Sequence, residues 1–188
     1  MKKLALFGVA LGLVVAVSCK KDDNNMTTTP TPTPVTMTLY DSLGGTTMVA
    51  DPSASGKQIE KGRLGIRSVV DSTIFVIAAD PKLNGFFPVL LSEVTAGNLS
   101  GFQTLSTNLT DFFCVATGAK NFSYKGMNMK DAHDPAKNSR MNGKAANADF
   151  DQFVVDLVAG AKKVGLSDQL IGQVGKVVET TRGDIVQK

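Results

Sequence analysis

The sequence predicts an all-α domain that follows a leader and a tether. Apolar residues recur at steps of three or four along several stretches, which places them on single helix faces. Glycine and an Asp-Pro pair separate these stretches, and no run shows the alternation of a half-buried strand. With 43% hydrophobic residues and a mean hydropathy near zero, 188 residues provide for one globular domain plus appendages.

Residues 1–18 are typical of a bacterial lipoprotein signal peptide. Two lysines precede the uncharged run from Leu4 to Val17, whose 14 residues are too few for a permanent membrane-spanning helix. The run ends in AVSC, which resembles a lipobox and makes Cys19 the predicted lipidation site. A secretory peptide that is cut nearby without lipidation is the alternative. We expect an exported protein, lipid-anchored to a bacterial membrane on its periplasmic side or at the cell surface.

Residues 19–37 are predicted to form a Thr/Pro-rich tether. They read CKKDDNNMTTTPTPTPVTM, which offers no apolar set to bury and favours an extended, polyproline-like chain. Cleavage before Cys19 would remove Lys2 and Lys3 from the 20 basic residues, which leaves 18 against 17 acidic ones and a net charge of +1. This balance gives no indication of a nucleic-acid partner.

Residues 38–188 form the domain, in which four longer helices are predicted. The first extends from about Ile66 to Ala79 and ends before Asp80-Pro81. The apolar stripes of the other three are Phe102, Leu105, Leu109, Phe112 and Ala116; Phe150, Phe153, Val154, Leu157, Val158, Ala161 and Val164; and Leu166, Leu170, Val174, Val177, Val178 and Ile185. Gly165 is expected to end the third helix and Ser167 to cap the fourth.

An ordered set of short motifs resembles the truncated haemoglobins, most closely their group I branch. The motifs are LYDSLGG, VVD, ADPKLNGFF, DFFCVATGA, YKGMNMKDAH and Phe150 at the head of the penultimate helix. The resemblance spans the whole domain. It implies a 2-over-2 helical sandwich of truncated globin type with haem b as cofactor.

The resemblance implies that His133, the only histidine, is the proximal ligand of haem iron. The chemistry agrees, because a neutral imidazole nitrogen is a suitable axial donor and five-coordinate haem requires one such ligand. Asp134-Pro135 directly after it is expected to end the proximal helix abruptly. Binding of Met127, Met129 or a lysine as a sixth ligand of the iron is an open alternative.

The resemblance further places five aromatic or thioether side chains around the haem: Phe86, Phe87, Phe112, Tyr124 and Met129. Such side chains provide the flat apolar contacts that a macrocycle needs, although plain core packing is the alternative for each. Lys130 could reach a haem propionate or remain solvated.

The expected distal side departs from the family. Ile74 stands where a tyrosine is common, and Leu105 and Leu109 stand where polar residues are frequent. Without a donor, we expect oxygen release to be faster by roughly five-fold or more and discrimination against carbon monoxide and nitric oxide to weaken. A one-residue shift in register would instead bring polar groups toward the iron, namely Thr73, Thr104, Ser106 or Asn108.

The favoured function is reversible binding of a diatomic gas, oxygen above all, by a lipid-anchored haem protein. The alternative is a haem enzyme that oxidises nitric oxide or uses peroxide, which needs an unidentified electron donor because the chain has no flavin or nicotinamide motif. A globin fold without haem, acting as an interaction module, would leave His133 without a role.

Two further features stay open at this point. The chain is longer than the family pattern by an insertion at about 50–66, interpreted as a lengthened first loop that is either a docking surface or tolerated length. Cys114 is interpreted as a small buried hydrophobe rather than a redox group, since no basic neighbour is apparent in the sequence.

Overall fold

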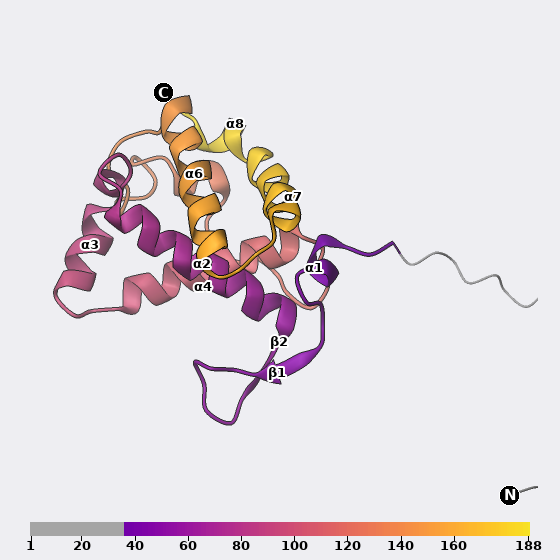
Figure 1. The fold of residues 1–188 in the computed structure, drawn as a ribbon. Coiled ribbons are helices and arrows are strands. Elements are labelled where there is room, and N and C mark those ends of the chain that lie inside the picture. Colours follow the sequence, from indigo (N-terminus) through magenta and orange to yellow (C-terminus); the bar gives the residue numbers. More distant parts are fainter. Residues whose placement is uncertain (1–35) are drawn as a thin grey trace, which may run out of the picture. The chain divides into compact units, whose positions relative to one another are not determined.

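Four long helices carry the fold of the described chain. The computed structural model describes residues 36–188, so the predicted signal peptide, Cys19 and the tether up to residue 35 lie outside the described residues. The long helices are α2 (Lys61–Ala79), α4 (Ser100–Ala116), α6 (Asn147–Lys163) and α7 (Asp168–Glu179). Helix α2 packs against both α4 and α6, and α7 packs against α6. In Figure 1, α6 and α7 lie over α2 and α4, which confirms the predicted all-α sandwich.

The ends of these helices follow local sequence signals. Gly165 adopts a φ of +79° and its amide donates to the Lys162 carbonyl, so α6 ends at the glycine as predicted. Ser167 then caps α7, because its hydroxyl accepts from the Leu170 amide at 3.4 Å. The predicted last stripe was too long, since the helix breaks after Glu179 and a separate short turn follows.

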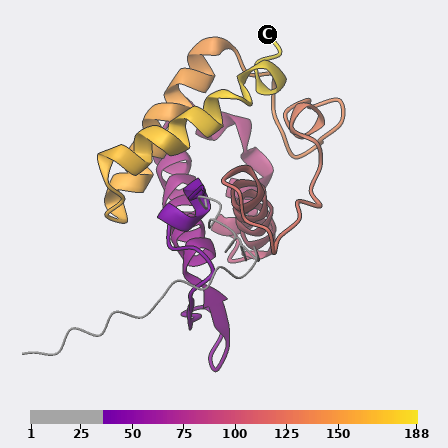
Figure 2. The ribbon, with the colours of Figure 1, turned by 90° about the vertical axis from the view of Figure 1, so that its right-hand side faces the viewer.

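The shorter helices connect the long ones. They are α1 (Leu39–Ser42), the 3₁₀ turn η1 (Asn84–Phe86), α3 (Pro88–Thr95), α5 (Met129–Ala132) and α8 (Arg182–Ile185). Figure 2 shows the long segment between α4 and α6, which contains α5, passing along one side of the helices. Within residues 36–188, every helix is too short or too polar to cross a membrane.

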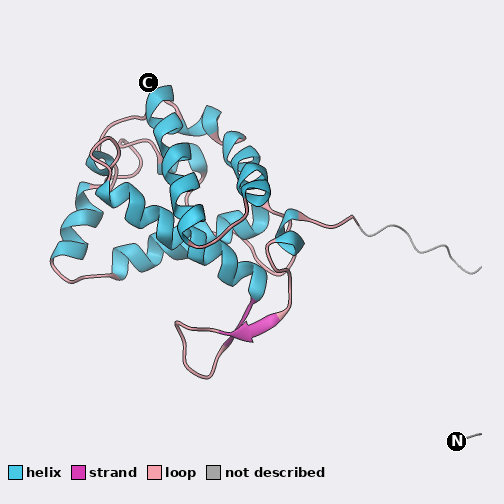
Figure 3. Cartoon of the chain, in the orientation of Figure 1, coloured by secondary structure: helices cyan, strands magenta, loops and turns pink. Residues whose placement is uncertain are grey.

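A β-hairpin precedes α2, although the sequence predicted no strands. Strands β1 (Met48–Ala50) and β2 (Gln58–Glu60) pair antiparallel, with Val49 opposite Ile59, and form the small sheet of Figure 3. Three-residue strands are too short for an alternation pattern to be visible in the sequence. The segment 50–66, predicted as a lengthened loop, therefore contains the hairpin turn, β2 and the start of α2, which begins at Lys61 rather than near Ile66.

The core depends on a close approach of α2 and α6. A Cβ added at Gly160 would lie 2.5 Å from the Thr73 hydroxyl oxygen and 2.8 Å from its backbone, so only glycine admits this crossing. Buried apolar side chains from both helices and from α7 fill the junction, namely Val69, Val70, Ile74, Leu157, Ala161, Val174 and Val178. The crossing fixes the angle at which α2 faces the remaining helices, and with it the wall of the site described below.

Cys114 is fully buried in α4, as the sequence predicted. The structure does supply a basic neighbour, because Arg63 Nη1 lies 3.9 Å from its sulfur and also pairs with Asp111 at 2.5 Å. Burial nevertheless outweighs this cation and raises the pKa of the thiol to about 11. The thiol stays protonated at neutral pH, which fits a packing role.

Candidate functional site

A cavity of about 640 Å³ lies between the helical core and the segment that contains α5. Its volume falls in the range of roughly 300–1,000 Å³ that is usual for cofactor and ligand pockets. All nine residues that the sequence predicted for a cofactor site line it, namely Ile74, Phe86, Phe87, Leu105, Leu109, Phe112, Tyr124, Met129 and His133. The fold thus brings together residues that lie up to 59 positions apart in the chain.

His133 enters the cavity from the C-terminal end of α5. Its Nδ1 lies 2.8 Å from the Met129 carbonyl oxygen, which can only accept, so Nδ1 carries the proton in the neutral ring and donates it. Burial lowers the pKa of the imidazole, although the Met129 carbonyl opposes the shift, and the ring is neutral at pH 7. Nε2 is therefore the unprotonated nitrogen, with a lone pair available to a metal.

The backbone around α5 explains why the Met129 carbonyl is free to accept from the ring. Asn128 caps the helix by accepting from the Asp131 amide at 2.9 Å. The His133 amide donates to the Lys130 carbonyl at 3.2 Å, so a tightened last turn leaves the Met129 carbonyl for the imidazole. Pro135 permits no further turn, and the helix ends where the sequence predicted.

Aromatic side chains form the floor of the cavity. Phe86 and Phe87 come from η1 and the residue after it. Phe112 and Tyr124 meet edge to face at 5.7 Å between ring centroids, and the Tyr124 hydroxyl donates to the Met127 carbonyl at 2.6 Å. Both rings are therefore held in fixed orientations, as a flat apolar ligand requires.

Helix α4 presents two ridges to the cavity. Leu105, Leu109 and Phe112 form an apolar ridge, and Thr104 and Asn108 stand beside it on the neighbouring ridge. The Thr104 hydroxyl donates to the Ser100 carbonyl at 2.9 Å, which occupies its proton.

The other two alternative donors lie elsewhere. Thr73 Oγ1 donates to the Val69 carbonyl at 2.8 Å, and Ser106 Oγ donates to Asp71 Oδ1 at 2.5 Å. Neither residue lines the large cavity. Of the four polar groups that a shift in register would bring near the iron, the geometry leaves the Asn108 amide as the available donor on this wall.

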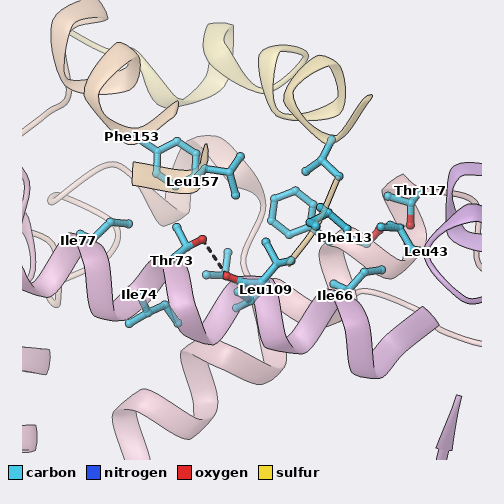
Figure 4. Close-up of a pocket in the computed structure, with 14 residues that line it drawn as sticks. Leu43, Ile66, Thr73, Ile74, Ile77, Leu109, Phe113, Thr117, Phe153 and Leu157 are labelled. Carbon is cyan, nitrogen blue, oxygen red and sulfur yellow. Dashed lines mark hydrogen bonds between the residues drawn. The ribbon is translucent and has the colours of Figure 1, made fainter. Parts of the chain in front are cut away.

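A smaller apolar cavity of about 60 Å³ adjoins the first and is lined mainly by residues of α2, α4, α6 and α7 (Figure 4). Ile74, Leu109 and Phe113 line both cavities. The hydroxyls of Thr73 and Thr117 donate to the Val69 and Phe113 carbonyls, and the other lining residues are aliphatic or aromatic. Such a lining does not hold an ordered water, because a water needs polar partners.

Sequence reasoning missed one wall and one ion pair of the cavity. Helix α3 contributes Leu90 and Leu91, and its signal was the proline at the first helical position of PVLLSEV. Glu93 of α3 pairs with Arg140, and both line the cavity. Lys130, considered for a propionate contact, does not line the cavity. No local pattern in the sequence links Glu93 to a residue 47 positions away.

The side chains of the cavity suit a metal whose other ligands come from a cofactor rather than from the protein. Among residues 36–188, the acidic, cysteine and histidine side chains nowhere gather in groups of three or more that could hold a bare ion. One neutral imidazole facing an apolar, aromatic-lined cavity instead fits an iron porphyrin, whose macrocycle supplies the four in-plane nitrogens. The residues present therefore fit haem.

Comparison with known proteins gives one consistent result. No family model matches the chain. The chain is 41% identical over 119 residues to the group 1 truncated hemoglobin of Tetrahymena thermophila, covering 60% of this chain and 92% of that protein. It is 38% identical over 79 residues to that of Tetrahymena pyriformis, covering 42% of this chain and 59% of the relative.

Solved structures show the same fold. The Fe(III) form of the truncated hemoglobin from Tetrahymena pyriformis aligns with a TM-score of 0.55 and 25% identity, over 80% of this chain and 99% of that chain. The cyanomet 2/2 hemoglobin from Synechococcus sp. PCC 7002, which carries covalently attached heme, aligns with a TM-score of 0.56 and 21% identity over the same shares.

Proposed function

The chain belongs to the group 1 truncated haemoglobins, a haem family, and we propose that it binds a diatomic gas reversibly at an iron held by His133. Oxygen is the ligand that we expect first, with nitric oxide and carbon monoxide as competitors. The cofactor is haem b. When bound, it supplies an iron with an open coordination position at which such gases bind.

The imidazole of His133 is the observation that carries this proposal. Its Nδ1 proton is committed to the Met129 carbonyl at 2.8 Å, which fixes the tautomer and the ring plane. The same bond makes Nε2 the better donor, because the accepting carbonyl increases the basicity of the ring. Phe86, Phe87 and Met129 line the same cavity and add apolar surface to it.

The opposite wall determines which gas is preferred. Ile74, Leu105 and Leu109 offer a bound gas no hydrogen bond, and the one available donor of this wall, Asn108, stands on the neighbouring ridge of α4. We propose that the gas lies against the apolar ridge and so lacks a neutral hydrogen bond worth about 1 kcal/mol net. We therefore propose release of oxygen faster by roughly five-fold or more than from a pocket with a donor, and weak discrimination against carbon monoxide.

Binding is favoured over turnover by the state of the acidic groups on the cavity wall. Glu93 is paired with Arg140, and Asp149 Oδ2 accepts from the Ala146 amide at 2.8 Å. Both carboxylates thus already have structural partners, and we assign neither a role in proton transfer. Oxidation of nitric oxide or use of peroxide would also require an external electron donor.

We also propose that the chain is exported and lipid-anchored through Cys19. The support is the leader of residues 1–18, with its two lysines, its uncharged run and its terminal AVSC. Mass spectrometry of the mature N-terminus tests this, with Cys19→Ser as control. A mature chain that retains Lys2, or one cut without acylation, would contradict it.

The test of the gas-binding proposal is an absorption spectrum of the chain produced with haem available. We expect a Soret band whose ferrous form is five-coordinate and shifts with carbon monoxide. His133→Ala should lose or alter this band, whereas Lys130→Ala, outside the cavity lining, should keep it. A wild-type chain without a Soret band would refute the proposal, and an unaltered band in His133→Ala would assign the iron to another ligand.

A further inference from the structure

The rim of the large cavity is crossed by one ion pair. Arg140 lies seven positions after His133, and its Nη1 and Nη2 donate to the two carboxylate oxygens of Glu93 in α3 at 2.9 and 2.5 Å. The Arg140 side chain is 46% exposed and that of Glu93 25%, yet both line the cavity. The pair therefore stands where the cavity meets solvent.

The two partners belong to opposite sides of the opening. Glu93 lies in α3, which packs against α4, the helix that carries Leu105 and Leu109. Arg140 is carried by the loop that continues from His133. The same loop is tied further on by Asn142, whose amide donates to the Phe86 carbonyl at 3.0 Å and whose side chain donates to the Gly85 carbonyl at 3.0 Å. The loop is thus closed onto the cavity at two points.

Gly101, in the first turn of α4, provides the space for this ion pair. A Cβ added there would overlap with Glu93 Oε2 and lie 2.5 Å from Arg140 Nη2. The atoms in its way are the ends of two flexible side chains rather than backbone. A side chain at this position would therefore displace the ion pair and leave the helix intact.

We propose that the Glu93–Arg140 ion pair is a clasp across the mouth of the haem cavity and sets the rate at which haem leaves. The inference rests on the proposed function. The clasp joins the loop after His133 to α3 by two charge-assisted hydrogen bonds, so a rigid macrocycle that leaves between these two elements must first break them. The half-exposed pair is open to screening by salt, so release should accelerate with ionic strength.

The test is the transfer of ferric haem from the full chain to excess apomyoglobin, followed by absorbance. Glu93→Gln and Arg140→Gln should each release haem about five-fold faster than wild type at low salt, and should lose the acceleration by salt. The charge-exchanged double variant Glu93→Arg/Arg140→Glu should return the rate to within about two-fold of wild type.

Gly101→Ala separates the clasp from the stability of the fold. Alanine favours a helix over glycine, so the apoprotein should unfold at a temperature no lower than wild type. Haem release should nevertheless be about five-fold faster, because the ion pair is displaced. The matched control is Asp51→Asn, which breaks the ion pair between Arg67 and Asp51, whose N–O distance is 2.8 Å. Neither residue lines the cavity, so the release rate should stay at the wild-type value.

The outcomes are distinguishable. A wild-type chain that takes up no haem overturns the clasp together with the proposed function. A wild-type chain that holds haem, with Glu93→Gln, Arg140→Gln and Gly101→Ala releasing it at the wild-type rate, overturns the clasp alone. Equal acceleration by Asp51→Asn also overturns it, since the effect would then be general loosening.

Discussion

The two walls of the cavity that we propose for haem are built in opposite ways. The wall that carries His133, residues 124–146 and here called proximal, consists of the four-residue helix α5 and loops. The wall here called distal consists of the cavity-facing sides of α2 and α4, which have 19 and 17 residues. Hydrogen bonds from side chains to backbone hold the first, as with His133 on Met129 and Asn138 on Ala132. The second is held by apolar packing and by two side-chain pairs that join α2 to α4, Asp71 with Ser106 and Arg63 with Asp111.

This difference reflects what each wall must supply. An axial ligand needs a polar partner to fix its tautomer, and backbone carbonyls become available where a helix ends. Helix α5 ends at His133 and so leaves the Met129 carbonyl to the ring. A regular helix such as α4 has committed its carbonyls and can offer only its side chains, which are Leu105 and Leu109 on the apolar ridge and Thr104 and Asn108 on the ridge beside it.

The largest expected effect comes from removing the His133 imidazole, the proposed ligand of the iron. His133→Gly should release haem at least about 100-fold faster than wild type, since even changes to groups behind a metal ligand cost roughly 10- to 100-fold. Added imidazole should restore the five-coordinate ferrous spectrum by filling the space left by the ring. The control on the distal wall is Leu105→Ala, which should keep that spectrum. If His133→Gly and Leu105→Ala lost the five-coordinate ferrous spectrum to the same extent, the two walls would not differ in how they hold haem.

The next effect comes from giving the distal wall a donor. Leu109→Gln should slow oxygen dissociation by about tenfold, because a hydrogen bond of about 1.4 kcal/mol to the bound gas becomes available. Leu109→Met keeps the wall apolar and is the control. Stopped-flow displacement of oxygen by carbon monoxide measures both. Wild-type release that is already slow, and that Asn108→Leu accelerates, would place a donor at Asn108 and contradict the apolar distal wall.

The distal wall was more accessible to sequence reasoning than the proximal wall. The three- and four-residue spacing of Leu105, Leu109 and Phe112 predicts one face of a helix, and the structure places all three on the cavity. Helices α2, α4, α6 and α7 follow from the same periodicity. The hairpin of β1 and β2 does not, because three residues are too few to show a period.

The proximal wall has no periodicity from which to predict it. His133 was found because the chain has one histidine and because the motif around it resembles a family, whereas its bond to Met129 depends on how α5 ends. The Glu93–Arg140 pair depends on the path of the loop, which brings together residues 47 positions apart. Non-local contacts of this kind are set by tertiary packing, and no local pattern encodes them.

A buried carboxyl in α6, the helix packed behind α2 of the distal wall, makes the stability of the fold dependent on pH. Asp156 of α6 is 4% exposed, and its Oδ2 and that of Asp80, at the end of α2, have no hydrogen-bond partner within residues 36–188. Burial is the main cause that raises the pKa of Asp156 above its ordinary value, and the charge of the nearby Asp80 raises it further. The hydrogen bond from Gln152 and the charge of Lys82 act in the opposite direction. Folding therefore favours the protonated form.

The sign of the effect follows from this raised pKa. The protonated carboxyl contributes stability that is fully present below its unfolded pKa and is lost as pH rises through the folded pKa. Asp156→Asn should therefore raise the free energy of unfolding by about 1 kcal/mol at pH 7, and by less near pH 4. Urea denaturation at both values measures this. A variant less stable than wild type at pH 7 would show that the charged form is the favoured one.

The smallest effect comes from removing a single hydroxyl from the proximal wall. Tyr124→Phe keeps the edge contact with Phe112 and loses the hydrogen bond of 2.6 Å to the Met127 carbonyl, at a cost of about 0.5 kcal/mol in urea denaturation. Thr104→Ala on the distal wall removes a hydroxyl that bonds only within its own helix, and should be neutral or slightly stabilising because alanine is the better helix former. If both variants cost the same, side-chain hydrogen bonds do not distinguish the walls, and the order of His133 must come from packing.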